Sequence, residues 1–365
     1  MPTRLLPQSP NLDHLKSQAR ELLRDHKTPS LQVLQRVREF HPRFHGVGDD
    51  AIAASGFRLS DAQLTIAREY GFLSWPRLKA FVEHPNGDDV RRAVHLRVTD
   101  PLFRKAIDLM DAGDADNLRA LLREHPQLAA QHTLIEGMNY FRTPGLIEFV
   151  AENPTRNGRL PANIVEIAQI VIDAGAKNDR RGLDDAVALV ASSEVAQKSG
   201  NQMALIRVLC AAGAEPNQAV LAPMLYAQFD AVEELLRCGA TMNVAIAAAT
   251  GRSAEAKATL PAATQDQRLL ALAFAAQFGH LDIVEQLIEA GVDPNRFTPH
   301  GHSHATPLHQ TALNNRVDIA RYLVDHGART DIADVLHRST PLGWARYAGN
   351  TEIAEYLAQI DDRER

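Results

Sequence analysis

The chain has 365 residues, of which 45% are apolar, 23% charged and 5% aromatic, the balance of a folded globular protein and not of a disordered one. Its formal charge of −6 is uneven, because residues 1–100 carry 15 Lys and Arg against 12 Asp and Glu while residues 101–365 carry 24 against 33, which argues against general nucleic-acid binding. No apolar run approaches 18 residues and the N-terminus lacks a signal-peptide pattern, so we expect a cytoplasmic protein with no membrane or nucleic-acid partner.

Residues 1–95 are predicted to form a small helical N-terminal module that ends at HPNGDD (84–89). Its helix starts are expected at the caps or first-turn residues Asn11, Pro29, Ser60 and Ser74. The segment LTIAREYGFLSWPRLKAFVE has the outline of a helix-turn-helix, but Arg77 stands where the second helix should pack an apolar residue. A docking or capping module is therefore the preferred interpretation.

A recurring helix end organises residues 101–360. In each case a glycine stands where the helix must end in a left-handed turn, at Gly175, Gly213, Gly239, Gly291 and Gly327. Successive glycines are 38, 26, 52 and 36 residues apart, and 52 is twice 26. We therefore predict a degenerate unit in the long interval, with its second helix near Ser253–Thr259. Units of 26 residues have room for two helices and little else, so two consecutive middle units are predicted to lack an extended connecting loop.

The units nearest the N-terminus are more divergent. Residues 101–126 read as a first helical pair, and the next unit begins at TPGLIEFVA (143–151) and carries an insertion at 152–163. If a helix continues through this segment, Glu148 and Glu152 share one face, and a solvated pair is expected. About eight helical pairs are predicted from 101 to 360, followed by a polar tail, 361–365. Cys210 and Cys238 precede Gly-Ala turns and are expected to be reduced core thiols.

Three strings carry a family resemblance: FAAQFGHLDIVEQLIEAGVDPN (274–295), TPLHQTALNNRVDIARYLVDHGARTD (306–331) and TPLGWARYAGNTEIAEYLAQ (340–359). They resemble the ankyrin repeat, and the chain resembles bacterial ankyrin-repeat proteins that carry an N-terminal helical module. The resemblance is strong over 274–360, weak over 101–273 and absent from 1–95. It implies an all-α fold, an ankyrin-repeat solenoid of about eight helical pairs with several degenerate or fingerless units, preceded by a small helical domain.

The resemblance also implies contact residues, because partners of ankyrin repeats touch the finger before TPLH and the pair that closes the first helix. Transferred to this chain, the predicted binding residues are His302, Ser303, His337, Tyr347, Gln277, Phe278 and Asn314. The fingerless units offer Ala227 with Gln228 and Ala249 with Thr250. The leading hypothesis is a cytoplasmic interaction protein that binds a protein partner through its concave groove and finger loops, with no cofactor required. A small apolar or neutral ligand is the other partner that such side chains suit.

The histidine-rich loop HGHSHATPLH (300–309) supports an alternative. In an extended loop His300, His302 and His304 share one face, and imidazole is a ligand for zinc, nickel and copper. His309 is the TPLH histidine, which in the family hydrogen-bonds neighbouring backbone. The alternative is a small-molecule binder or metal-assisted enzyme that uses this loop with a divalent metal. No known catalytic motif occurs, so enzyme activity is not expected and no catalytic residue is assigned.

Overall fold

A computed structural model describes residues 6–7, 10–72, 74–83, 94–135, 140–298 and 304–363. In this part of the chain the regular elements are helices, and one isolated β-bridge joins His132 to Gly145. The prediction of an all-α fold is confirmed. None of the helices in these ranges combines the length and apolar character that crossing a membrane requires. The chain divides into two compact units, Met1–Ala186 with Ser193–Asn201 and Val187–Ser192 with Gln202–Arg365.

The first unit begins with five α-helices. These are α1 (Leu12–Asp25), α2 (Leu31–Phe40), α3 (Asp49–Ala53), α4 (Leu59–Glu69) and α5 (Trp75–Glu83), with a 3-10 turn, η1, at Pro42–Phe44. Asn11 caps α1 as predicted, but α2 begins after Ser30 and leaves Pro29 outside the helix. Ser60 lies inside α4, because the Asp61 carboxylate accepts the N–H of the residue before the helix at 2.7 Å and so sets an earlier start.

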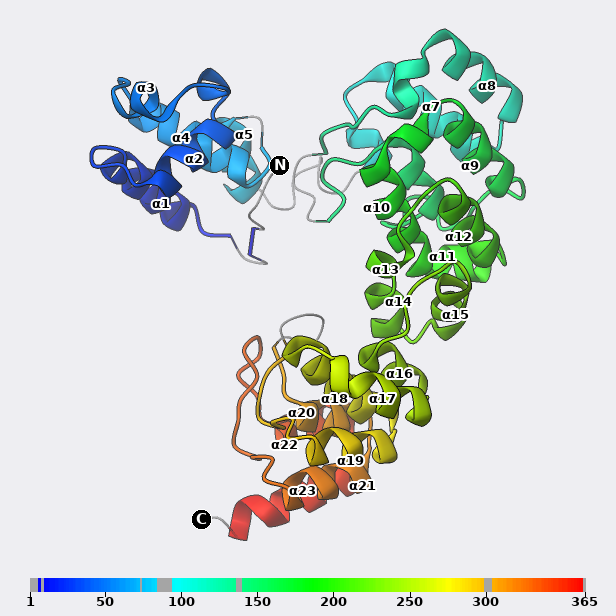
Figure 1. Cartoon of the computed structure of the whole chain (residues 1–365). Coiled ribbons are helices and arrows are strands. Elements are labelled where there is room, and N and C mark those ends of the chain that lie inside the picture. The colour runs from blue at the N-terminus through cyan, green and yellow to red at the C-terminus, as the bar shows by residue number, and fades with distance from the viewer. Residues whose placement is uncertain are drawn as a thin grey trace. The chain divides into compact units, whose positions relative to one another are not determined.

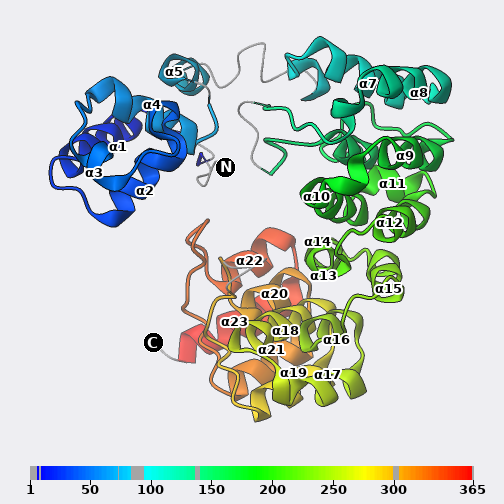
Figure 2. The same ribbon diagram turned by 45° about the horizontal axis from the view of Figure 1, so that its top comes forward.

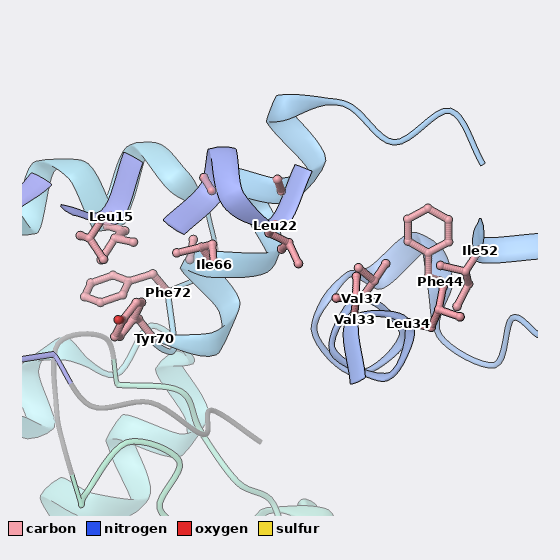
Figure 3. Packing of buried hydrophobic residues seen from close by; sticks show 14 residues of the cluster. Leu15, Leu22, Val33, Leu34, Val37, Phe44, Ile52, Ile66, Tyr70 and Phe72 are labelled. Carbon is pink, nitrogen blue, oxygen red and sulfur yellow. The ribbon is translucent and has the colours of Figure 1, made fainter. Parts of the chain in front are cut away.

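These five helices enclose an apolar core of their own, of which Figure 3 labels ten residues. The core residues shown there are Leu15, Leu22, Val33, Leu34, Val37, Phe44, Ile52, Ile66, Tyr70 and Phe72. A bidentate ion pair joins α2 to α4, with Arg36 Nε and Nη2 2.7 and 3.0 Å from the buried carboxylate of Glu69. A shared core is what an N-terminal module requires. Its boundary, expected near residue 95, lies beside the undescribed residues 84–93 and stays a prediction.

Eight helical pairs follow in the described residues. The pairs are α7 (Pro101–Ala112) with α8 (Ala115–Glu124), η4 (Leu146–Ala151) with α9 (Ile164–Asp173), α10 (Arg180–Ala191) with α12 (Gln202–Ala211), α14 (Leu221–Leu225) with α15 (Phe229–Arg237), α16 (Val244–Thr250) with α17 (Ser253–Thr259), α18 (Gln265–Phe278) with α19 (Leu281–Glu289), α20 (Pro307–Leu313) with α21 (Val317–Asp325), and α22 (Pro341–Ala348) with α23 (Thr351–Arg363). The degenerate second helix predicted near residues 253–259 is present as α17. Helix α23 continues to Arg363, inside the predicted polar tail.

Shorter elements connect these pairs. They are η2 (Val94–Arg97), η3 (Pro126–Ala129), η5 (Ala176–Asn178), α11 (Glu194–Lys198), α13 (Pro216–Ala219) and η6 (Leu260–Ala262). The connections to α16 and α18 are short, residues 238–243 and 260–264, whereas those to α20 and α22 span 290–306 and 326–340. The middle units therefore lack the long loop, as their spacing predicted.

In the second unit the helices of successive repeats lie in two rows (Figures 1 and 2). The first helices α16, α18, α20 and α22 pack side by side, and the second helices α17, α19, α21 and α23 form the other row. Each repeat thus buries its apolar face against its neighbours, which is how repeat proteins build a continuous core.

Side chains from one pair bind the carbonyls that end the first helix of the preceding pair. Those donors are Asn163, Gln228, Arg316 and Asn350, while Gln202 binds the last carbonyls of α10 within its own pair. These carbonyls have no partner inside their own helix, so the bonds both satisfy them and couple neighbouring repeats. The close approach also explains a glycine: Gly279 has φ +91°, and a Cβ there would lie 3.1 Å from the Arg316 guanidinium.

Gln310 in α20 is a polar residue in an apolar position. It is 1% exposed, and neither its Oε1 nor its Nε2 has a hydrogen-bond partner in the described residues. The equivalent position of the preceding repeat holds the fully buried Phe274. We expect Gln310→Leu to raise the free energy of unfolding by about 1–3 kcal/mol, because it removes an uncompensated buried amide. Urea denaturation measures this, with the exposed Gln359→Leu as control. A loss of stability would show that the amide is paired.

Candidate functional site

The binding residues predicted from the sequence lie in different surroundings. His300, His302 and Ser303 are outside the described residues, so their placement stays a prediction. Tyr347 in α22 is 91% exposed, and His337 is exposed in the loop before α22. Gln277 and Asn314 are partly exposed.

Three residues occupy the same position at the ends of adjacent first helices. Gln277, Leu313 and Tyr347 align in the sequences of α18, α20 and α22, which pack side by side. Leu313 and Tyr347 are both exposed apolar side chains. We call these three residues the helix-end row. It presents apolar and amide side chains without a charge.

At the next position along α18 and α20 the side chain has a structural role instead. Phe278 forms ring contacts with Phe274 and Phe229, with centroids 6.0 and 5.1 Å apart. Asn314 Nδ2 donates to the carbonyl of Gln310 at 2.9 Å and so closes the end of α20. Asn314 is therefore held by its own helix and Phe278 by aromatic rings of α18 and α15, and a partner would reach only their remaining exposed parts.

The structure shifts the predicted pair in the unit of α14. Ala227 has φ +54° and occupies the left-handed turn that glycine fills elsewhere, and Gln228 is buried. The residues that close α14 are thus Leu225 and Tyr226, and Tyr226 is exposed. The sequence interpretation missed Tyr226 because alanine replaces the usual glycine and hides the register.

The loop 326–340 before α22, which we call the C-terminal finger, is organised around Asp334. The buried Asp334 carboxylate accepts the backbone N–H groups of Leu336, His337 and Ser339 at 2.9, 2.7 and 3.0 Å. It also accepts the indole N–H of Trp344 at 3.0 Å. Burial by itself would raise the pKa of Asp334, but these donors outweigh it and hold the pKa at about 2. The carboxylate therefore stays ionised and shapes the finger.

The tip of the C-terminal finger presents side chains that the sequence interpretation did not select. Val335 and Leu336 are 61% and 66% exposed. Arg338 in the same finger and Arg346 in α22 are exposed and form no ion pair in the described part of the chain. The two adjacent apolar residues in this loop were the sequence signal that could have identified the tip.

The described histidines of the 300–309 loop surround Trp344. His309 is buried, with Nδ1 2.8 Å from Thr306 Oγ1 and Nε2 3.1 Å from the carbonyl of Ser339. Burial lowers the pKa of both His309 and His304. The His304 ring lies 5.7 Å from that of Trp344 between centroids. No group of three or more metal-ligating side chains occurs among the described residues. Because His300 and His302 lie outside them, the predicted metal site stays a prediction.

A second group of ionisable residues lies in the first unit. Glu148 in η4 is 2% exposed and accepts the N–H of Gly145 at 2.7 Å. Burial raises the pKa of Glu148 to about 8, and the nearby Asp185 and Asp179 act in the same direction. Asp179 in turn lies 2.7 Å from His132 Nε2. At neutral pH most of the Glu148 carboxyl groups are therefore protonated.

The expectation that Glu148 and Glu152 form a solvated pair is wrong. The helix does not persist: η4 ends at Ala151, and Glu152 adopts φ +50° in the left-handed region. Glu152 is buried and accepts the N–H groups of Arg156 and Asn157 at 2.6 Å each. The two carboxyl groups thus have separate structural roles. That of Glu148 is buried within η4, and that of Glu152 orders the inserted segment 152–163.

Residues 272–364 match the family model described as ankyrin repeats (3 copies). Similar proteins include Palmitoyltransferase Hip14 of Drosophila melanogaster, 40% identical over 76 residues, which are 21% of this chain and 12% of that protein. Putative palmitoyltransferase ZDHHC13 of Danio rerio is 40% identical over 83 residues, 23% of this chain and 12% of that protein. Ankyrin repeat and KH domain-containing protein mask-1 of Caenorhabditis elegans is 37% identical over 93 residues, 26% and 3% respectively.

The similarity therefore covers about a quarter of this chain, and this chain spans at most 12% of the length of these three relatives. Residues 272–364 are ankyrin repeats, the kind of module that generally mediates contacts between proteins. The activities in the relatives' names belong to those proteins.

Proposed function

We propose that the chain is a cytoplasmic ankyrin-repeat protein of the bacterial kind that binds a protein partner through its C-terminal repeats. The contacts come from the C-terminal finger and the helix-end row, in the concave groove that such repeats form. No cofactor takes part. The two free cysteines fit a reducing compartment.

The observation that carries this proposal is the exposure of large apolar side chains on consecutive elements. Tyr347 is the most exposed of them, and Val335 and Leu336 follow in the adjoining finger. Tyrosine is enriched among the residues that dominate binding energy, because it buries a large rigid surface and keeps a polar tip. Arg338 and Arg346, which form no ion pair in the described part of the chain, flank these side chains in sequence and supply charge at the rim.

The alternative, a small-molecule binder or metal-assisted enzyme, depends on His300 and His302. Both lie outside the described residues. The described His304 contacts Trp344 and His337 by its ring, which supports a role in ordering the finger. Protein binding is therefore the function that the described residues favour.

We expect Tyr347→Ala to weaken partner binding by about 30-fold, the effect of losing a contact worth about 2 kcal/mol. The partner is first identified by cross-linking and mass spectrometry in the native host, and its affinity for each variant is then measured by calorimetry. Tyr322→Ala, in the second-helix row, is the matched control and should bind normally.

Circular dichroism of both variants separates binding from folding. Tyr347→Ala should keep the helical signal, because the side chain is almost fully exposed. Equal affinity for Tyr347→Ala and the unaltered protein, or a loss of helix comparable to that of a core substitution, would contradict the proposed surface.

A further inference from the structure

The only two cysteines of the chain lie in neighbouring repeats. Cys210 is in the last turn of α12, and Cys238 directly follows α15, the helix that packs against α12. Both are free thiols and both are partly exposed, so neither is the core thiol that the sequence suggested.

An ion-pair network sets the register between the two helices. Arg207 Nε and Nη2 donate to the two carboxylate oxygens of Glu234 at 2.7 and 3.1 Å, and Arg237 Nη1 donates to the same carboxylate at 2.7 Å. Cys210 is three residues beyond Arg207, and Cys238 is four residues beyond Glu234. One helical turn past the ion pair, the packing of α15 on α12 therefore brings the two thiols close enough to interact with each other.

We propose that Cys210 and Cys238 form a binding site for one soft monovalent cation of the Cu(I) class, held by two thiolates. Thiolate sulfur is the donor that Cu(I) prefers, and a pair of them suffices for a two-coordinate ion. Binding exchanges two protons for the metal, so that two R–SH groups and Cu⁺ give [Cu(SR)₂]⁻ and two H⁺. No oxidant or reductant is needed.

The surroundings favour a soft ion over a hard one. The two donor atoms of the proposed site are both sulfur. A hard cation such as Mg²⁺ prefers oxygen ligands and gives up its water reluctantly, whereas a soft cation prefers thiolate sulfur. Arg207, which interacts electrostatically with Cys238, offsets part of the negative charge of the complex.

The first test asks whether one reagent molecule spans both sulfurs. Phenylarsine oxide condenses with two adjacent thiols, so that C₆H₅AsO and two R–SH give C₆H₅As(SR)₂ and H₂O. We expect one equivalent to lower the thiols titratable with Ellman's reagent in the folded, full-length protein from two to zero. A dithiol such as dimercaptopropanol should restore both, and a monothiol should not. Cys210→Ser and Cys238→Ser should each keep one titratable thiol after a monothiol wash.

The second test uses Cu(I) itself. Under anaerobic conditions the protein should withdraw one Cu(I) per chain from its bathocuproine complex, and this Cu(I) should protect both thiols from phenylarsine oxide. Cys210→Ser is the matched control, because it keeps every histidine and so reports any copper bound by the 300–309 loop. Circular dichroism checks that the variant is folded. Equal Cu(I) uptake by Cys210→Ser, or an arsenical adduct that Cu(I) does not prevent, would overturn the proposal.

Discussion

Glu148→Gln is expected to make the protein more stable at pH 8, by about 3–5 kcal/mol relative to the unaltered chain. The buried carboxyl of Glu148 has its pKa raised from 4.5 to about 8, with burial as the largest cause. At pH 8 and above the ionised group lacks water and faces Asp185 and Asp179. Glutamine is neutral at every pH and keeps the oxygen that accepts the N–H of Gly145.

The sign follows from proton counting. Between pH 4.5 and pH 8 the folded protein holds the proton of Glu148, whereas the unfolded chain has released it. The contribution of Glu148 to stability therefore falls as pH rises through this window. Burial lowers the pKa of His26 and His41, and these histidines act in the opposite sense below pH 6.5. The two histidines contribute equally to the stability of Glu148→Gln and of the unaltered protein, so their effect cancels when the free energies of unfolding are subtracted.

Urea denaturation of both proteins from pH 4.5 to pH 8.5 measures the difference between the free energies of unfolding of Glu148→Gln and the unaltered protein. It should be small at the acid end and grow toward pH 8. Glu255→Gln, on the exposed side of α17, is the control and should show no such trend. A difference that is constant across the range would mean that Glu148 does not titrate between these limits.

Asp334→Ala is expected to cost about 3 kcal/mol, because it removes the acceptor of three backbone N–H groups and one indole N–H. The loss should be local to the C-terminal finger. Amide hydrogen exchange should rise at Leu336, His337 and Ser339, and the fluorescence of Trp344 should shift toward that of an exposed indole. Partner binding should weaken as well, since Val335 and Leu336 lose their fixed position.

Asp331→Ala is the matched control in the same finger. Asp331 is exposed and forms a surface ion pair with Arg329 at 2.7 Å, so its loss should change stability by no more than about 0.5 kcal/mol. The unaltered protein should also lose the contribution of Asp334 as pH falls from 3.8 toward 2, because the folded-state pKa is depressed to about 2. Unchanged exchange rates in Asp334→Ala would refute the ordering role of this carboxylate.

Structural features that depend on a few adjacent residues could be predicted from the sequence. The glycine separations located the fingerless units and the short helix α17, because a left-handed turn after a helix is decided by a few adjacent residues. The TPLH and TPLG strings located α20 and α22 for the same reason: threonine and proline start a helix wherever it packs.

Features that depend on what packs nearby could not be predicted. The register of α14 escaped notice because Ala227 fills a turn where glycine is the usual signal. The finger tip was overlooked because the exposure of Val335 and Leu336 depends on the hydrogen bonds of Asp334. Its carboxylate accepts hydrogen bonds from adjacent residues and also from Ser339 and Trp344, which lie further along the chain.

Sequence alone thus determined that this protein is helical, that it carries ankyrin repeats near its C-terminus, and where the repeats are shortened. These properties follow from caps, turns and periodic apolar positions, which act over a few residues. Tertiary structure decided which groups lose water and which meet. It buried Glu148 beside Asp179 and Asp185, and it brought Cys210 to Cys238. Burial and long-range contacts set the charge and reactivity of these groups, and neither burial nor such contacts can be inferred from the residues adjacent in sequence.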